Sequence, residues 1–272
     1  MIAALEEEQT AIGAIRSYVH LPAGEVPDEN GFVTGLAMRE LWMRGAGEEA
    51  AALRDRAGRF LLRCESPRFP GLFSFWPEYG YPSWIGDVRL YEDADDSAIC
   101  ALELVRCGIR TEDALVQTAR RLAFRHRVHD PVMLTAPWHR LGVFPTWLWP
   151  GARNTIDCCV NANVVALLAA AHMRDAPGYA EACAMIEEAT EWAGAAPERL
   201  RAIVPYYPHP SELARALEHA LRCGAAELEP AARRLQSIAW LHECADDTPV
   251  CSSADGRIVW TAPALQRARR GR

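Results

Sequence analysis

The sequence alternates between two kinds of helical segment, and this alternation limits the folds open to a chain of 272 residues. Segments of the first kind have Glu in the first turn, further charges, and apolar residues spaced i, i+3, i+4. They are residues 6–19, 48–65, 112–127, 178–194 and 227–242. Segments of the second kind are apolar around the helix and often rich in Ala. They are residues 30–45, 93–108, 157–174, 209–224 and 259–270. We therefore expect a charged outer layer and an apolar inner layer of helices.

The alternation predicts an all-α chain folded as an α/α barrel (toroid) of about five outer/inner helix pairs. No linker or shift of composition divides it, so residues 1–272 are expected to form one domain. In such a barrel, every connection from an outer to an inner helix lies at the same end. Two of these connections are long, residues 66–92 and 128–156, and long loops in compact domains are usually functional. They hold five of the nine tryptophans: Trp76, Trp84, Trp138, Trp147 and Trp149.

Composition excludes several classes of partner. Half of the residues are apolar and the formal net charge is −7, which argues against nucleic acid or an anionic membrane as the main partner. No run of 18 apolar residues predicts a membrane span, and the first residues are acidic where a signal peptide is basic. We therefore expect a cytoplasmic chain whose nine cysteines are reduced thiols.

The most specific signal is an acidic cluster where the first long loop meets an inner helix. Glu92, Asp93, Asp95 and Asp96 place four carboxylates in five residues. One interpretation is a helix N-cap, because acidic side chains accept hydrogen bonds from the free N–H groups and oppose the helix dipole. The other is a general acid, because crowded carboxylates in apolar surroundings raise one another's pKa and keep a proton.

The run Asp93-Ala-Asp95-Asp96-Ser97-Ala resembles the D-x-D-D-T-A motif of class II terpene cyclases, which include squalene–hopene cyclases and class II diterpene cyclases. Residues 259–265 are also similar to the starts of inner helices in prenyltransferase and squalene-cyclase repeats. The resemblance implies an α/α barrel in which Asp95 protonates a terminal alkene or epoxide, while Asp93 and Asp96 tune it. The implied substrate is a hydrophobic isoprenoid or terpenoid. Cyclases of this class usually place the cavity between two barrels, so a second subunit or a homodimer would complete it here.

A second polar cluster, residues 154–163, opens the next inner helix. Asp157 and Asn161 are four apart and share a face, so both could point into the barrel mouth. The alternative is a helix cap with buried cysteines and amide hydrogen bonds. Asp157, Cys159 and His209 are also similar to the zinc ligands of protein prenyltransferase β subunits. Capping and core roles explain these residues more simply, so we expect neither metal nor cofactor.

The aromatic loops have three interpretations: a hydrophobic lid, stacking on sugar rings, or a cradle for a carbocation. The candidate substrate-binding residues are Trp76, Trp84, Tyr91, Trp138, Trp147, Trp149, Asp157, Asn161 and His209. Four arginines could hold an anionic head group or neutralise the acidic mouth: Arg68, Arg89, Arg140 and Arg153.

The sequence therefore favours a class II terpene cyclase-like enzyme. One alternative is a carbohydrate-active α/α-barrel hydrolase or lyase with Asp157 as second carboxylate. The other is a non-catalytic barrel that binds a lipid or a partner.

Overall fold

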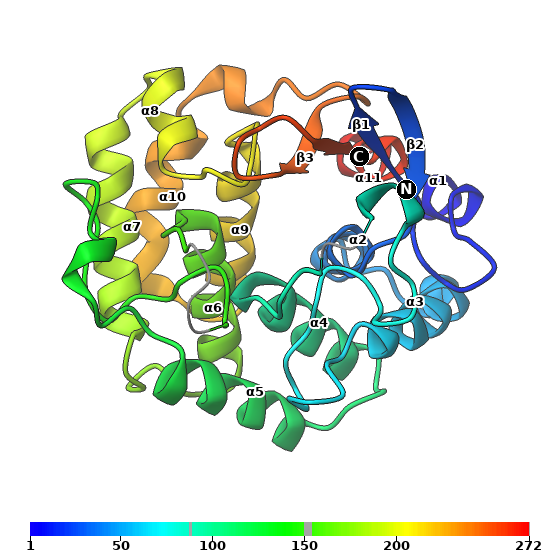
Figure 1. The fold of residues 1–272 in the computed structure, drawn as a ribbon, viewed down its shortest axis with the longest axis horizontal. Coiled ribbons are helices and arrows are strands. Elements are labelled where there is room, and N and C mark those ends of the chain that lie inside the picture. Colours follow the sequence, from blue (N-terminus) through cyan, green and yellow to red (C-terminus); the bar gives the residue numbers. More distant parts are fainter. Residues whose placement is uncertain (87–88, 150–153, 272) are drawn as a thin grey trace.

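The computed structural model describes residues 1–86, 89–149 and 154–271 (Figure 1). The α-helices in this part of the chain are α1 (Ile2–Glu7), α2 (Gly31–Met43), α3 (Ala51–Arg63), α4 (Ala94–Arg106), α5 (Glu112–Arg125), α6 (Cys158–Ala170), α7 (Tyr179–Ala193), α8 (Pro197–Ala202), α9 (Ser211–Arg222), α10 (Glu229–Gln236) and α11 (Pro263–Arg270). The strands are β1 (Ser17–Leu21), β2 (Gly24–Asp28), β3 (Pro249–Ser252) and β4 (Val259–Thr261).

The helices form an inner and an outer row. α2, α4, α6 and α9 pack side by side in this order, and Figure 1 shows them nearer the centre than α3, α5 and α7. α3 packs on α2 and α4, α5 on α4 and α6, and α10 on α7 and α9. The inner helices α2, α4 and α6 are buried almost all round, whereas α3 and α5 bury one face. α6 contains no charged residue, and most charged side chains of α2 and α4 are buried, whereas α3 and α5 expose a charged face to water.

Most of the predicted helices are present. The inner segments 30–45, 93–108, 157–174 and 209–224 contain α2, α4, α6 and α9, and the outer segments 48–65, 112–127 and 178–194 contain α3, α5 and α7. Segment 227–242 is helical in its middle, α10, with short 3₁₀ turns on both sides. These predictions are confirmed.

The prediction of a first outer helix over residues 6–19 is wrong. The chain leaves the helix at Glu7, and Gly13 has a φ of +98°. A Cβ at that position would lie 2.2 Å from the carbonyl oxygen of Arg56, so the backbone there is a tight turn against α3. After the turn, Ser17 and Val19 are buried and Tyr18 is half-buried, which is the two-residue period of a strand.

The last inner helix starts four residues later than predicted, because Val259–Thr261 is strand β4 and α11 begins at Pro263. A proline at this position suits a helix start, where its missing N–H is not needed. The all-α prediction is therefore also wrong in one respect. The described residues include an antiparallel sheet in the order β2-β1-β4-β3, which joins an N-terminal hairpin to a C-terminal one.

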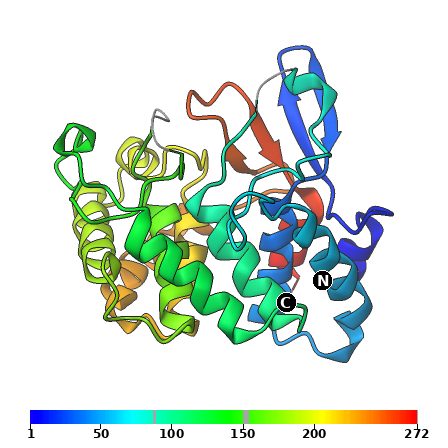
Figure 2. The same cartoon turned by 60° about the horizontal axis from the view of Figure 1, so that its bottom comes forward.

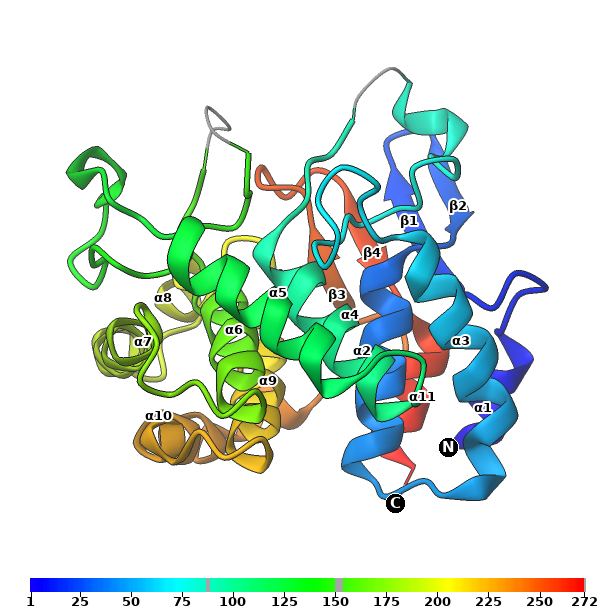
Figure 3. The same cartoon turned by 90° about the horizontal axis from the view of Figure 1, so that it is seen from below.

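The two long connections and the two hairpins lie at the same end of the helices (Figures 2 and 3). The inner helices α2, α4 and α6 all begin there, with Asn30, Asp93 and Asp157 as caps whose side chains accept from the first turn. The described parts of the two long connections meet at Asp93, where Phe73 and Trp147 pair with it as isolated β-bridges. The start of α4 is thus fixed between both loops.

Candidate active site

Asp93 is the N-cap of α4. Its Oδ1 accepts a hydrogen bond of 2.6 Å from the backbone N–H of Asp96, so capping accounts for this member of the acidic cluster. Asp95 and Asp96 stand in the first turn of the helix and are as buried as the cap. Capping does not account for these two carboxylates.

The carboxyl group of Asp95 has two polar contacts. Its Oδ1 accepts from Asn163 Nδ2 at 2.6 Å, and its Oδ2 accepts from the hydroxyl of Tyr207. Asn163 is itself held by Arg39, whose Nη1 donates to Asn163 Oδ1 at 3.0 Å. Burial and the charge of Asp93 raise the pKa of Asp95 well above its ordinary value, and the bond from Asn163 opposes them only in part. The structure therefore favours a protonated carboxylic acid at position 95.

Asp93 and Asp96 form a pair of buried carboxyl groups. Both oxygens of Asp96 are buried, and no N–H or O–H group of the described residues donates a hydrogen bond to them. Burial is the largest cause that raises the pKa of both groups, and the negative charge of Asp93 raises the pKa of Asp96 further. A proton on Asp96 can be donated to Asp93, so the pair holds one proton between two carboxylates.

These carboxyl groups open into a cavity of about 610 Å³. Asp93, Asp95 and Asp96 line it together with Thr146 and residues of both long loops, the hairpins and the segment before α9. Its aromatic lining consists of Phe32, Phe75, Trp76, Trp84, Trp147, Tyr206, Tyr207 and Trp260. The cavity is thus an apolar, ring-lined space with buried acids on one side.

Three indoles form the most compact part of the wall. The ring centroid of Trp76 lies 5.6 Å from that of Trp84 and 6.2 Å from that of Trp260, and Trp84 and Trp260 are 6.1 Å apart. Phe75 packs edge-on against Trp76 and Trp260. Such contacts fix large rings relative to one another, so the wall is rigid.

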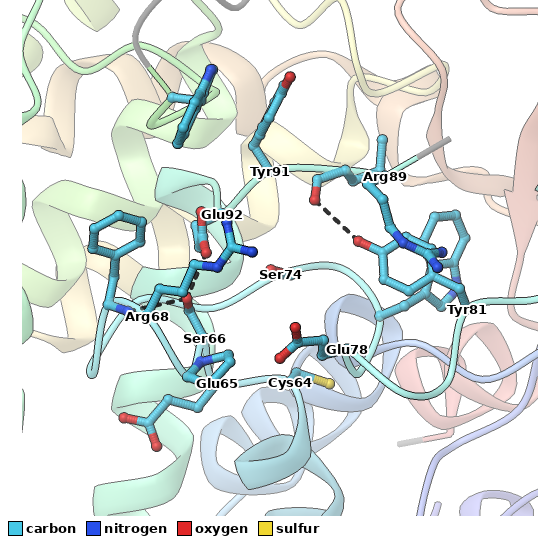
Figure 4. Close-up of a pocket in the computed structure, with 15 residues that line it drawn as sticks. Cys64, Glu65, Ser66, Arg68, Ser74, Glu78, Tyr81, Arg89, Tyr91 and Glu92 are labelled. Atoms are coloured by element: carbon cyan, nitrogen blue, oxygen red, sulfur yellow. Dashed lines mark hydrogen bonds between the residues drawn. The ribbon is translucent and has the colours of Figure 1, made fainter. Parts of the chain in front are cut away.

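A smaller pocket of about 320 Å³ adjoins the cavity and shares Trp76 and Leu90 with it (Figure 4). Its walls are more polar. Ser66 Oγ donates to Glu92 at 2.5 Å, and the guanidinium of Arg89 lies over the ring of Tyr81. At its rim Tyr91 and Trp149 stack with nearly parallel rings, 5.3 Å between centroids. The cavity, rather than this pocket, contains the acidic cluster.

The structure brings together some of the predicted site residues and separates others. The cavity is lined by Asp93, Asp95, Asp96, Trp76, Trp84 and Trp147. Tyr91 and Trp149 line the smaller pocket, as do Arg68 and Arg89. Neither space is lined by Trp138, Asp157, Asn161 or His209. Arg140 pairs with Glu188 at the surface, and Arg153 lies outside the described residues.

Asp157 and Asn161 act within the fold and do not face the cavity. The carboxylate of Asp157 accepts from the backbone N–H groups of Cys159, Val160 and Tyr206. Burial raises the pKa of Asp157 to about 7, although these three bonds act in the opposite direction. Asn161 exchanges two hydrogen bonds with the backbone of Phe144 in the second long loop. Asp157 does not line the cavity that Asp95 lines, where the carbohydrate-active alternative would place it as the second carboxylate.

Asp157, Cys159 and His209 do not form a metal site. No group of three or more His, Cys, Asp and Glu side chains placed to hold a metal ion occurs among the residues that the structure describes. His209 Nδ1 contacts Ser211 Oγ at 2.7 Å, and the Cys159 thiol is buried, which raises its pKa well above the ordinary value. The described residues also include no helix long and apolar enough to span a membrane.

Four residues of the site were not predicted from the sequence. Tyr207 and Asn163 hold Asp95, Arg39 holds Asn163, and Trp260 belongs to the aromatic wall. Trp260 was treated as the start of a helix, although its neighbours Val259 and Thr261 are both β-branched. Tyr207 follows another tyrosine between two prolines just before an inner helix, a local signal that would have marked this short connection as part of the working end.

Comparison with known proteins gives a weak likeness. No protein-family model matches the chain, and no curated protein matches it. A variant of the type II terpene cyclase MstE from Scytonema, without ligand, has a TM-score of 0.47 at 16% identity, covering 98% of this chain and 91% of that one. Another variant of the same enzyme, in complex with its substrate geranylgeranyl dihydroxybenzoate, has a TM-score of 0.46 at 14% identity, covering 98% and 92%.

Proposed function

We propose that this protein is a class II terpene cyclase-like enzyme, in which Asp95 protonates an isoprenoid or terpenoid substrate to start cyclisation. One observation carries the proposal: a buried carboxyl group with a raised pKa opens into an apolar, aromatic cavity and forms no ion pair with any Arg that the structure describes. An acid kept neutral in such a site can give its proton to a weakly basic double bond.

The proposed first step moves the Asp95 proton to the less substituted carbon of a terminal alkene. A C–H bond forms with the two electrons of the π bond, and the positive charge stays on the more substituted carbon. The next double bond of the chain then supplies the electrons of the ring-closing C–C bond, which leaves the positive charge on the other carbon of that double bond. Loss of a proton from a neighbouring C–H bond to water or another base, with the electrons of that bond forming a new double bond, gives the neutral cyclic isomer. The carboxylate left at Asp95 keeps its hydrogen bonds from Asn163 and Tyr207, which are stronger to the charged form than to the acid. These two side chains therefore favour proton release.

The aromatic lining would stabilise the positive charge. Ring faces attract cations, and the attraction is larger where water is excluded. Trp76, Trp84 and Trp260 supply three indole rings to the same cavity as Asp95. The cavity volume of about 610 Å³ lies in the range of sites for small organic ligands.

The proposal includes the architecture expected from sequence. We propose that the inner row α2, α4, α6 and α9, together with α11, closes as a single α/α barrel in one domain. Two observations support closure: α11 packs on α2, and α2 also contacts α9. The Asp93-Ala-Asp95-Asp96 run would then stand at the mouth of a squalene cyclase-like barrel, and the overall reaction would be an isomerisation or a lyase step.

The test is incubation of the purified chain with linear prenyl substrates of different length and head group. The panel should contain geranylgeranyl dihydroxybenzoate, free prenyl alcohols, prenyl diphosphates and terminal epoxides, with products identified by mass spectrometry. Cyclic isomers of one or more members are expected. Binding of prenyl compounds without conversion would instead favour the non-catalytic, lipid-binding alternative.

A further inference from the structure

Asp28, at the end of β2, is a buried carboxylate outside the acidic cluster. It is 3% exposed and receives three N–H donors: Trp76 Nε1 at 2.9 Å on Oδ1, and Trp260 Nε1 at 2.9 Å and Asn30 Nδ2 at 2.8 Å on Oδ2. Asn30 is fixed in turn, because its Oδ1 accepts from the backbone N–H of Val33 as the cap of α2. Three N–H donors satisfy this buried carboxylate, so the fold holds the Asp28 side chain in one position.

The two indoles come from distant parts of the chain and meet at this one carboxylate. Trp76 belongs to the first long loop and Trp260 to strand β4. Both line the cavity, whereas Asp28 does not. The carboxylate therefore contacts the N–H edges of the rings from behind the wall, on the side away from the ligand space.

The hydrogen-bond pattern favours the ionised form of Asp28. Burial raises the pKa of Asp28 above its ordinary value, and the bonds from Asn30, Trp76 and Trp260 offset part of that rise. All three partners are donors, so a proton on either oxygen would displace a bond without gaining an acceptor. An anionic acceptor strengthens each N–H bond and polarises the indole, which makes the ring more attractive to a cation.

We propose that Asp28 is a positioning residue of the cavity, which orients Trp76 and Trp260 and tunes their rings so that the wall binds a positive charge. The role of this wall in stabilising a reaction intermediate rests on the proposed function. The wall itself would select an alkylammonium ion with an apolar chain over a neutral molecule of the same shape. That selectivity can be measured without turnover.

The test compares two ligands, farnesyl trimethylammonium and its neutral isostere with a quaternary carbon in place of nitrogen. Their dissociation constants can be measured by calorimetry on the intact chain. The wild-type protein is expected to bind the cation roughly 5- to 30-fold more tightly, the range of cation–π attraction at desolvated sites. Asp28→Asn should reduce this ratio by at least about threefold and leave the neutral ligand within about twofold. The two indoles donate to different oxygens of Asp28, and the amide replaces one of these oxygens with an NH2 group that cannot accept.

Tyr206→Phe is the matched control. Trp147 also lines the cavity, but its Nε1 donates to the neutral hydroxyl of Tyr206 at 3.0 Å. Loss of that neutral acceptor should change the cation-to-neutral ratio by less than about twofold. An equal fall of the ratio in both variants, or an unchanged ratio in Asp28→Asn, would overturn the inference.

A second variant covers the case that Asp28→Asn does not fold. Trp260→Phe keeps a ring in the wall but removes the N–H that Asp28 holds, so the ratio should fall by at least about twofold. An unchanged ratio there would also contradict the inference. The outcomes separate the two proposals: an Asp28-dependent ratio in a protein that converts no prenyl substrate supports the positioning role and refutes the cyclase. Cyclisation of a prenyl substrate, together with a cation-to-neutral ratio that is unchanged in Asp28→Asn, supports the cyclase and refutes the positioning role.

Discussion

Two buried clusters of acidic residues in this molecule differ in whether arginine side chains form ion pairs with them. Between α2, α9 and α11, Arg269 forms a bidentate ion pair with Glu212, in which Nη1 and Nη2 donate to the two carboxylate oxygens at 2.5 and 2.8 Å. Glu40 in the same cluster pairs with Arg44, Arg215 and Arg269. At the start of α4, no Arg forms an ion pair with Asp93, Asp95 or Asp96 within the described part of the chain.

The difference appears in the pKa values. Burial would raise the pKa of Glu40, but the charges of Arg269, Arg215 and Arg44 lower it below the ordinary value. Burial and the charges of neighbouring carboxylates raise the pKa of Asp95 and Asp96, and at Asp95 the hydrogen bond from Asn163 and the charge of Arg39 offset that rise only in part. The first cluster joins helices through ion pairs, whereas the second has acids with a raised pKa. Burial of a carboxylate is therefore not by itself a sign of function; burial without an ion pair is the informative observation.

The largest expected effect is on activity, at the acidic cluster. Asp95→Asn removes the transferable proton, so turnover should fall by about 10²–10⁴-fold. Stability should change little, because the amide oxygen can still accept from Asn163 and Asp93 still caps the helix. Product yield and melting temperature on the same preparations check both parts. Asp96→Asn is the matched control and should lose less activity; normal turnover in Asp95→Asn would contradict the assignment.

The largest expected effect on stability belongs to the other cluster. Arg269→Met leaves the carboxylate of Glu212 buried without its partner, which should cost about 3–5 kcal/mol in the free energy of unfolding. Urea denaturation measures it. Arg267→Met, at a half-exposed pair with Asp246, is the control and should cost below about 1 kcal/mol. Similar losses in the two variants would remove the contrast between the clusters.

Tyr207→Phe should have an intermediate effect. It deletes the hydroxyl that donates to Asp95 but keeps the ring in the cavity wall. A hydrogen bond to a charged group contributes about 1.5–3 kcal/mol, so turnover should fall by roughly 10- to 100-fold if the bond is strongest in the ionised state. Steady-state kinetics check this. A change in KM alone would mean that the hydroxyl acts in substrate binding and not in proton release.

The sequence predicted the position of α4 and its acids well, because N-caps and helix periodicity are local signals. It could not predict which aromatic residues face the cavity. Trp138 and Trp147 occupy the same loop, yet only Trp147 lines it. Asn163, Tyr207 and Arg39 meet at Asp95 from three different segments, which only tertiary packing brings together. The sheet was missed because strands of three to five residues carry too short a period to compete with helix patterns.

The smallest effect concerns the dependence of stability on pH. Asp96 has a higher pKa in the folded than in the unfolded chain, so the folded state binds more protons above the ordinary carboxyl value. The contribution of Asp96 to the free energy of unfolding is therefore present at low pH. It is lost as the pH rises toward the pKa that Asp96 has in the folded chain. Asp96→Asn should flatten that decline and raise stability at pH 8 by about 1 kcal/mol. Denaturation at pH 5 and pH 8 measures both; a steeper decline in the variant would contradict the raised pKa.

The source of the first proton is the central claim, and deuterium labelling tests it most directly. A carboxylic acid in contact with solvent exchanges its proton, so protonation by Asp95 in deuterium oxide would deliver deuterium to the substrate. With a terminal alkene as substrate, the label would remain in a C–D bond of the ring carbon next to the branched one. Mass spectrometry of the cyclic product should then show one added deuterium, at that carbon. Cyclic product formed in deuterium oxide without any carbon-bound deuterium would contradict protonation as the initiating step.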